Sequence, residues 1–366
     1  MKVRKKAMWL TLLLILILAI SSLIAYSYPA IGRAPSGERL ERILHSSNYR
    51  NGHFHNQHAT VLMTSKENRW KALWKFLFAH YKDLKPSNSL PTVKTDLLHL
   101  DRSEEIIVWF GHSSLFIQTG GKRILVDPVL TSRLPVSLMM RPFKGTDIYS
   151  PDDIPEIDYL LITHDHWDHL DYGTVKSIKN RVGKVICPLG VGEDFEYWGF
   201  SSDKIIEMDW NETLRLGGEM KIHCLPARHF SGRFLNSNVT LWASFLIDGP
   251  KRIYLSGDSG YDTHFLEIGK KYPDIDLAIM ENGQYNKDWN LIHDMPDMLP
   301  QAIADLHPKA VMTVHNSKFA LSKHPWYEPL DNIYRASQGK PYKLLTPMIG
   351  EKIELDNANY QTKKWW

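Results

Sequence analysis

The sequence predicts an α/β fold in which two β-sheets are layered between helices. Short apolar segments with strand character are mixed with helical stretches from Glu105 onward. The first of these segments form a meander around the hairpin dipeptide Gly120-Gly121. His and Asp side chains follow several of the apolar segments directly, which places them at the edge of a sheet. Mixed strands and helices of this kind pack as layers around a hydrophobic core.

The composition is that of a folded globular protein. Hydrophobic residues make up 43% of the 366 residues, and 44 Lys and Arg against 41 Asp and Glu give a formal net charge of +3. These values exclude a disordered, collagen-like or coiled-coil chain, and the small charge does not favour nucleic-acid binding. The 2 Cys exclude a disulfide-rich scaffold and a four-thiolate zinc site. The 17 His are therefore the informative residues.

The N-terminal segment, residues 1–28, is predicted to be a membrane anchor or signal segment. Ala7 to Gly32 carries no charge, and its apolar part is long enough to cross a bilayer at roughly 20 residues per crossing. The charges before it are all positive: Lys2, Arg4, Lys5 and Lys6. By the positive-inside rule we expect a single-pass transmembrane helix with the catalytic domain extracytoplasmic, in the cell envelope. A cleaved signal peptide is the alternative, although Ala25-Tyr26-Ser27 is a poor cleavage site.

Residues 29–100 are predicted to form an N-terminal extension, rich in Asn, Ser, His and Pro. Within it, apolar side chains recur at helical spacing at Trp70, Leu73, Trp74, Leu77, Phe78 and Tyr81, with Lys and Arg between them. This spacing predicts an amphipathic helix with a basic polar face. Two interpretations of the helix remain open. It either lies on anionic lipid or packs its aromatic face on the main domain and leaves the lysines in solvent.

Residues 101–366 are predicted to form the main domain. Strands are expected at Ile106–Phe110, Leu115–Ile117, Arg123–Val126, Tyr159–Thr163, Lys221–Leu225, Leu241–Ile247, Arg252–Leu255, Leu277–Met280 and Ala310–Val314. Helices are expected at Tyr172–Asn180, Asp262–Lys271 and Pro296–Leu306. The side chains that come directly after the strands are the candidates for a functional site.

The most informative segment is Thr163 to Asp171, which reads Thr-His-Asp-His-Trp-Asp-His-Leu-Asp and follows a buried strand. His164 and His166 are two residues apart, so both imidazoles can turn toward one ion. Asp168 and His169 follow at once and can reach a second ion. Neutral imidazole and carboxylate suit Zn(II), Mn(II) or Fe(II). A polar surface loop gives no reason to concentrate imidazoles in this way, so the segment predicts a metal centre.

This segment resembles the His-x-His-x-Asp-His motif of the metallo-β-lactamase superfamily. The resemblance covers roughly Glu105 to Met348 and implies a four-layer αββα sandwich that holds one or two metal ions between its sheets. The later ligand motifs of the superfamily resemble Pro226 to His229, Ser256 to Tyr261 and Thr313 to His315. Each of these segments follows an apolar strand, as a site at a sheet edge requires.

The resemblance implies a complete set of ligands for two ions. The first ion would be held by His164, His166 and His229, the second by Asp168, His169 and His315, and Asp258 would bridge both. Two Zn²⁺ ions are implied, and Mn²⁺ or Fe²⁺ would suit the same ligands. Cys187 and Cys224 fall outside every motif and are expected to be buried packing residues.

Other segments resemble one branch of this superfamily, the N-acylphosphatidylethanolamine-hydrolysing phospholipase D enzymes and their bacterial RomA-like relatives. The segments that carry this resemblance are Pro35 to Ile43, Trp109 to Ser114, Leu125 to Val129, Phe319 to Leu321 and His324 to Pro329. The sequence departs from the branch mainly in the loop Glu281–Asp294 and around Asn316 to Lys318. These motifs identify a lineage better than they identify a substrate.

The resemblance implies a binuclear metal-dependent hydrolase. We expect a phosphodiesterase of phospholipase D type that acts on N-acylphosphatidylethanolamine or a related phospholipid through a hydroxide bridging the metals. Catalytic roles are expected for Asp168, Asp258 and His293. The alternative is a lactonase or another carboxylic-ester hydrolase with the same metal site. A non-catalytic envelope or binding protein would be marked by a lost ligand, and none of the ligand positions is lost.

Further residues are expected around the metals. His112 and Asp127 would orient the ligand imidazoles, although Asp127 also suits a turn before a proline. His293 would contact substrate phosphate or protonate a leaving group, and a surface loop position is the alternative for it. Arg228 and Arg233 flank a predicted ligand and are candidates for contact with an anionic substrate.

Overall fold

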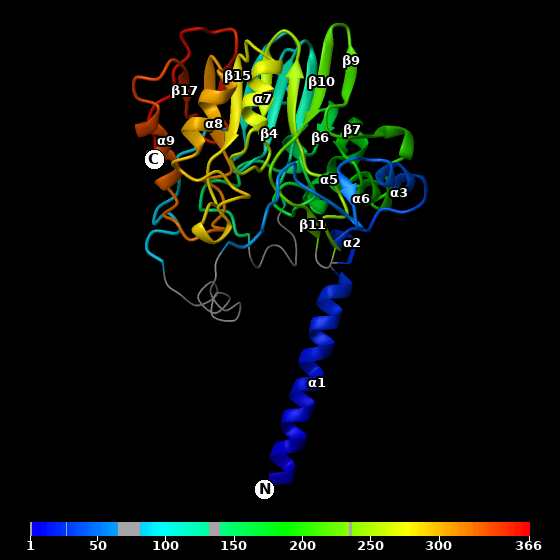
Figure 1. The fold of residues 1–366 in the computed structure, drawn as a ribbon. Coiled ribbons are helices and arrows are strands. Elements are labelled where there is room, and N and C mark those ends of the chain that lie inside the picture. Colours follow the sequence, from blue (N-terminus) through cyan, green and yellow to red (C-terminus); the bar gives the residue numbers. More distant parts are fainter. Residues whose placement is uncertain (1, 27, 65–80, 132–139, 234–235) are drawn as a thin grey trace.

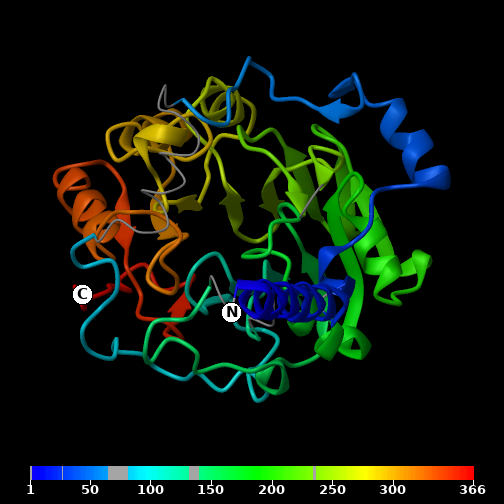
Figure 2. The ribbon, with the colours of Figure 1, turned by 90° about the horizontal axis from the view of Figure 1, so that it is seen from below.

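The two sheets of the fold stack face to face, and helices cover their outer faces (Figures 1 and 2). The structure, a computed structural model, describes residues 2–26, 28–64, 81–131, 140–233 and 236–366. Each sheet has seven strands. The predicted αββα sandwich is therefore confirmed.

The first sheet has the strand order β18-β3-β4-β5-β6-β7-β8. These strands are β18 (Lys352–Glu354), β3 (Ile106–Trp109), β4 (Leu115–Thr119), β5 (Lys122–Val126), β6 (Ile157–Leu161), β7 (Val182–Pro188) and β8 (Ile205–Met208). Neighbours from β18 to β5 pair antiparallel, and neighbours from β5 to β8 pair parallel. Gly120 and Gly121 both have positive φ and make the predicted turn between β4 and β5.

The second sheet has the strand order β17-β16-β15-β14-β13-β10-β9. These strands are β17 (Lys343–Leu345), β16 (Ala310–Val314), β15 (Leu277–Glu281), β14 (Arg252–Leu255), β13 (Ser244–Asp248), β10 (Met220–Leu225) and β9 (Thr213–Gly217). Neighbours from β9 to β14 pair antiparallel, and neighbours from β14 to β17 pair parallel. Both sheets thus join an antiparallel half to a parallel half.

Parallel strands need crossover connections, and helices supply them on the outer faces. On the first sheet lie α5 (Tyr172–Ile178) and α6 (Gly192–Tyr197). On the second lie α7 (His264–Lys271), α8 (Leu299–Leu306) and α9 (Glu328–Ala336). The observed α5, α7 and α8 each fall inside a range predicted to be helical.

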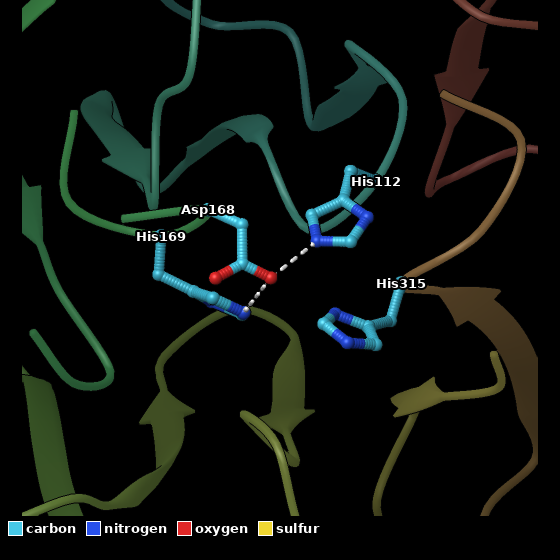
Figure 3. A group of neighbouring side chains, drawn as sticks. All are labelled: His112, Asp168, His169 and His315. Carbon is cyan, nitrogen blue, oxygen red and sulfur yellow. Dashed lines mark hydrogen bonds and ion pairs between the residues drawn. The ribbon is translucent and has the colours of Figure 1, made fainter. Parts of the chain in front are cut away.

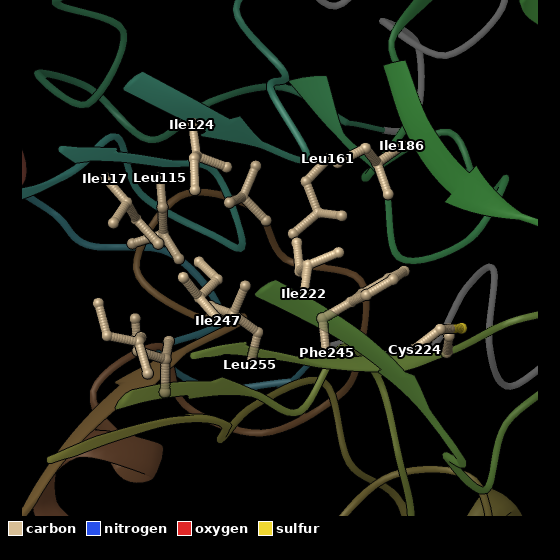
Figure 4. Close-up of a cluster of buried hydrophobic side chains, with 14 of the residues drawn as sticks. Leu115, Ile117, Ile124, Leu161, Ile186, Ile222, Cys224, Phe245, Ile247 and Leu255 are labelled. Carbon is tan, nitrogen blue, oxygen red and sulfur yellow. The ribbon is translucent and has the colours of Figure 1, made fainter. Parts of the chain in front are cut away.

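The main core lies between the two sheets (Figure 4). Ile117, Ile124 and Leu161 project from the first sheet toward Ile222 and Phe245 of the second, and all five side chains are buried. Complete burial of such a side chain stabilises the fold by about 1.5–3 kcal/mol. Because this packing fixes the two sheets against each other, the loops at their shared edge are held in place.

The N-terminal helix α1 (Lys2–Tyr26) extends away from the sandwich (Figure 1). Among the described residues, no helix is both long enough and apolar enough to cross a membrane. The predictions of a transmembrane helix and of a single-pass, extracytoplasmic placement are therefore wrong.

The described part of the N-terminal extension contacts both halves of the sandwich: its first helices pack on the first sheet and its helices, and residues 53–64 contact loops of the second sheet. It contains α2 (Tyr28–Ile31), α3 (Gly37–Leu44), β1 (Tyr49–Arg50) and β2 (His53–Phe54). From α3, the Arg39 guanidinium contacts carboxylates of Glu193, Glu196 and Glu207 at 2.7–3.1 Å. The amphipathic helix predicted from Trp70 lies, apart from Tyr81, outside the described residues, so both interpretations of it stay predictions.

Candidate metal centre

The predicted metal ligands gather at one edge of the sandwich, where strands of both sheets end. His164, His166, Asp168 and His169 follow β6, and His229, Asp258 and His315 follow β10, β14 and β16. Strand β6 belongs to the first sheet and the other three strands belong to the second. Segments far apart in the sequence therefore meet where the two sheets come together.

The first group of ligands consists of His164, His166 and His229, whose candidate donor atoms all lie within 4.8 Å of one another. The Nε2 atom of His164 lies 2.8 Å from Nδ1 of His166, and Nε2 of His229 lies 3.3 Å from the same atom. Burial lowers the pKa of His164 and His229 well below the ordinary value. Their imidazoles are therefore neutral at neutral pH, which is the form that binds metals.

The second group consists of His112, Asp168, His169 and His315 (Figure 3). Oδ2 of Asp168 lies 2.9 Å from Nε2 of His112 and 3.7 Å from Nε2 of His169. Burial alone would raise the pKa of Asp168, but the imidazoles of His169 and His112 hold it well below the ordinary value. The carboxylate therefore stays ionised and able to bind a cation.

Asp258 lies between the two groups and turns one oxygen toward each. Its Oδ1 is 3.3 Å from Nε2 of His169 and 3.2 Å from Nδ1 of His315. Its Oδ2 is 3.9 Å from Nε2 of His164 and 3.8 Å from Nε2 of His229. A carboxylate that bridges two ions requires this placement.

Unpartnered polar atoms at the centre test whether metal ions fit. Nε2 of His169 and Oδ1 of Asp258 are buried, and neither has a hydrogen-bond partner among the residues that the structure describes. Each such atom costs about 1–3 kcal/mol unless a ligand satisfies it. Burial would lower the pKa of His169, but Asp258, Asp168 and Asp127 raise it well above the ordinary value, and this carboxylate charge is what bound dications would neutralise. The donor set therefore fits divalent cations, and suits Zn(II), Mn(II) and Fe(II) alike.

Several polar groups orient the predicted ligands from outside. Oδ2 of Asp127 lies 2.7 Å from Nδ1 of His169, and its carboxylate also accepts hydrogen bonds from the main-chain N–H and the hydroxyl of Thr163. Nδ1 of His229 lies 2.8 Å from the Ile292 carbonyl oxygen. These contacts turn the opposite nitrogen, Nε2, toward the centre. Asp127 thus lies where its carboxylate can orient His169.

Within the second group, His112 acts as a hydrogen-bond donor and not as a predicted metal ligand. A histidine that binds metal through one nitrogen usually donates its other N–H to a partner. In the described part of the chain, the buried Nδ1 of His112 has no such partner, whereas Nε2 faces the Asp168 carboxylate. The neutral tautomer that carries its proton on Nε2 therefore satisfies the geometry best, and His112 positions Asp168.

Three residues at this edge have strained backbone conformations. His112, Asp127 and His315 have φ values of 52°, 40° and 66°, in the left-handed region that side chains other than Gly rarely adopt. Each such conformation costs about 1–3 kcal/mol and persists only where the surroundings enforce it. The sandwich therefore stabilises three residues of the site in conformations that they would not adopt in a free loop.

His293, the predicted catalytic histidine, is 9% exposed and does not lie on the surface. Its ring centroid is 5.0 Å from that of His229 and 5.4 Å from that of His315. By contrast, the guanidinium groups of Arg228 and Arg233 donate to main-chain carbonyl oxygens, and the structure does not bring them into the ligand groups. Their hydrogen bonds indicate a structural role.

Sequence reasoning did not identify Glu281 and Asp294 as site residues. Both are buried, and Glu281 belongs to a group of candidate donor atoms with Asp258, His293 and His315. A signal was available, because a charged residue directly after the apolar segment Leu277–Met280 ends at the same sheet edge as the predicted ligands. The sequence does not reveal the partner of Glu281, which is His293 in the loop after β15.

Comparison with known proteins shows which protein family the chain belongs to. The profile of the β-lactamase superfamily domain matches residues 122–316, more than half of the chain. An uncharacterized protein of Mycobacterium tuberculosis is 33% identical over 331 residues, which are 88% of this chain and 87% of that protein. The chain belongs to the metallo-β-lactamase superfamily. The identity to this relative extends well beyond the segment that carries the ligands.

Two further relatives of this metallo-β-lactamase superfamily chain have functional names. The N-acyl-phosphatidylethanolamine-hydrolyzing phospholipase D 1 of Caenorhabditis elegans is 29% identical over 244 residues, or 62% of this chain and 67% of that enzyme. The outer membrane protein RomA of Klebsiella pneumoniae is 57% identical over 98 residues, or 26% of this chain and 74% of that protein. The predicted resemblance to this branch is confirmed.

Solved structures of the superfamily share the fold. The diiron β-hydroxylase CmlA from Streptomyces venezuelae superimposes with a TM-score of 0.54 at 22% identity; the match covers 69% of this chain and about half, 54%, of that enzyme. An isothiocyanate hydrolase from Delia radicum gut bacteria gives a TM-score of 0.53 at 16% identity and covers 68% and 98% of the two chains. Because the chain belongs to this superfamily and has the His and Asp clusters of a metal site, it is a metal-dependent hydrolase.

Proposed function

We propose that this hydrolase is binuclear and cleaves phosphodiesters in the manner of a phospholipase D, with N-acylphosphatidylethanolamine or a related phospholipid as substrate. The observation that carries the binuclear assignment is the placement of Asp258, whose Oδ1 and Oδ2 face different groups of predicted ligands. The substrate class is supported by the relatives that are named as phospholipase D enzymes.

The residues of the chain divide the work of this reaction. Two divalent cations, when bound, would lower the pKa of water toward about 7 and stabilise negative charge on substrate oxygens. One cation would be held by His164, His166 and His229 and the other by Asp168, His169 and His315, with Asp258 shared between them. His293 lies beside both groups and would give a proton to the leaving alcohol. The products would be a phosphatidic acid and a free alcohol.

The test compares two substrates on the purified full-length chain. We expect metal-dependent hydrolysis of N-acylphosphatidylethanolamine and no comparable turnover of an acyl-homoserine lactone. Turnover of the lactone alone would overturn the phosphodiester assignment and establish the carboxylic-ester alternative. Asp258→Asn should lower kcat at least about 100-fold, since loss of a shared ligand removes about 3 kcal/mol or more of transition-state stabilisation.

The matched control for this substitution is Asp248→Asn. Asp248 ends β13, at the opposite edge of the same sheet, and its carboxylate pairs with Arg252. This variant should keep the wild-type kcat. Equal activity of Asp258→Asn and Asp248→Asn would contradict the proposed site.

A further inference from the structure

The end of strand β15 carries a buried carboxylate for which the proposed reaction assigns no role. Glu281 is 0% exposed and follows four apolar residues of the same strand, Leu277 to Met280. Burying a carboxylate is costly unless hydrogen bonds or charges compensate for the lost water. The partners of Glu281 therefore indicate why it is there.

Both carboxylate oxygens of Glu281 hold the loop that carries His293. Oε2 lies 2.9 Å from Nδ1 of the His293 ring, and Oε1 accepts a hydrogen bond of 2.5 Å from the main-chain N–H of Asp294. On the other side, the main-chain N–H of Glu281 donates to Oγ of Ser256, two residues before Asp258. Glu281 therefore fixes the imidazole and its backbone relative to the loop of the bridging carboxylate.

The contact with Glu281 determines which nitrogen of His293 remains available. Nδ1 is directed at the carboxylate, and among the described residues none forms a hydrogen bond with Nε2. The His293 ring stacks on the His315 ring at an interplanar angle of 19°, and it meets the His229 ring edge to face at 69°. Nε2 is thus free to meet a substrate next to the candidate metal ligands.

We infer that Glu281 is a positioning residue: it binds the Nδ1–H of His293 and so holds Nε2–H toward the oxygen of the departing alcohol. This inference rests on the proposed hydrolase function. In the step concerned, the phosphorus–oxygen bond to the alcohol breaks and its electron pair stays on that oxygen. The oxygen of water forms the new bond to phosphorus. The Nε2 proton passes to the alcohol oxygen, while Nδ1 keeps its proton and remains hydrogen-bonded to the Glu281 carboxylate. The attacking water then supplies the proton that restores Nε2–H.

The test compares leaving groups that differ in their need for a proton. The two substrates share the phosphatidyl group: N-acylphosphatidylethanolamine releases an alkyl alcohol, and phosphatidyl-p-nitrophenol releases a stable phenolate. Because general acid catalysis contributes about 10²–10⁴-fold, Glu281→Gln should lower kcat for the alkyl substrate at least about 10-fold and for the aryl substrate less than about 3-fold. His293→Gln should show the same selectivity, and the double variant should lose little more than either single variant.

Structural and ligand roles give other results. Equal losses on both substrates would show that Glu281 only supports the loop, and a loss of bound metal in Glu281→Gln would show that it is a ligand; either result overturns the inference. Glu207→Gln is the matched control, because Glu207 is a half-buried carboxylate paired with Arg39 on a distant strand. It should not discriminate between the substrates.

Two additions keep the inference testable under other outcomes. If the wild-type protein cleaves carboxylic esters and not phosphodiesters, the proposed function is wrong but the inference about Glu281 can still be tested. The same comparison of leaving groups is then made with a p-nitrophenyl ester and an ethyl ester. If Glu281→Gln does not fold, ¹⁵N NMR of histidine-labelled wild-type protein reports the ring directly. We expect Nδ1 of His293 to carry a proton, and an unprotonated Nδ1 would overturn the inference.

Discussion

Asp127 controls the second group of ligands through a single contact. Its Oδ2 accepts the Nδ1–H of His169 at 2.7 Å, which leaves the lone pair of Nε2 for a metal ion. In Asp127→Asn, the amide can donate to Nδ1 and move the proton to Nε2, where it blocks binding. We expect metal affinity at the second position to fall about 10–100-fold. Metal titration followed by calorimetry measures this change.

Asp165→Asn is the matched control for the Asp127 substitution. Asp165 is also buried and lies in the same ligand-bearing loop, but it accepts hydrogen bonds from Gly232 and Thr240 and from no predicted ligand. Both ions should bind this variant as they bind the wild type. If the two variants bound metal equally well, the orienting role of Asp127 would be rejected.

At the residue scale, the sequence was informative where chemistry depends on local spacing. One short loop contains His164, His166, Asp168 and His169, so the sequence alone predicted that they bind metal together. The contact between Glu281 and His293 could not, because it joins a strand end to a separate loop and depends on the fold. Arg228 and Arg233 were named as candidates for substrate contact for the same reason. Their hydrogen bonds to main-chain carbonyl oxygens join distant segments and depend on the fold.

Gly257 shows how the strand ends constrain the site at the scale of elements. It lies directly before Asp258 with a φ of 58°, and a Cβ there would lie 2.7 Å from the Ala243 carbonyl oxygen. Gly257→Ala must therefore move the loop after β14. We expect a loss of stability of about 2–4 kcal/mol, from the left-handed backbone and the contact together, and weaker metal binding. Urea unfolding measures the first effect.

Gly218→Ala separates the backbone cost from the contact. Gly218 has the same φ of 58° in the turn between β9 and β10, and a Cβ there would meet nothing within 4 Å. This variant should lose only about 1–2 kcal/mol and keep its metals. Equal losses in both variants would show that the space around Gly257 is unimportant.

Strand and helix positions were predictable where the apolar pattern is continuous. The segment Ala310–Val314 was predicted at its observed bounds, whereas Leu241–Ile247 begins before the observed Ser244–Asp248. Strand β7 (Val182–Pro188) was not predicted because Gly183 and Lys184 interrupt its pattern. The three-residue strands β17 and β18 exist only because they pair with β16 and β3, and a short segment carries no record of such partners.

The stability of the whole molecule should depend on pH through buried histidines. His264, at the start of α7, is 1% exposed, and burial lowers its pKa from 6.5 to about 3. Between these values the unfolded chain binds a proton that the folded chain does not, so stability falls as the pH is lowered. From pH 7 to pH 5 this group alone should remove about 2 kcal/mol.

The variant His264→Gln isolates this contribution. Its free energy of unfolding should fall by about 2 kcal/mol less than that of the wild type between pH 7 and pH 5. His53→Gln, which removes an exposed imidazole on β2, controls for the loss of a histidine. Parallel pH profiles for the wild type and His264→Gln would contradict the assigned effect of burial.

The central claim concerns two metal ions held by both sheets, and a titration of the stripped protein tests it most directly. The full chain is freed of metal with a chelator and reloaded with Zn²⁺, Mn²⁺ or Fe²⁺. Bound ions per chain are counted by elemental analysis while phosphodiester hydrolysis is measured at each step. We predict that activity rises to its maximum at two bound ions per chain. Full activity with one ion or none would contradict the account.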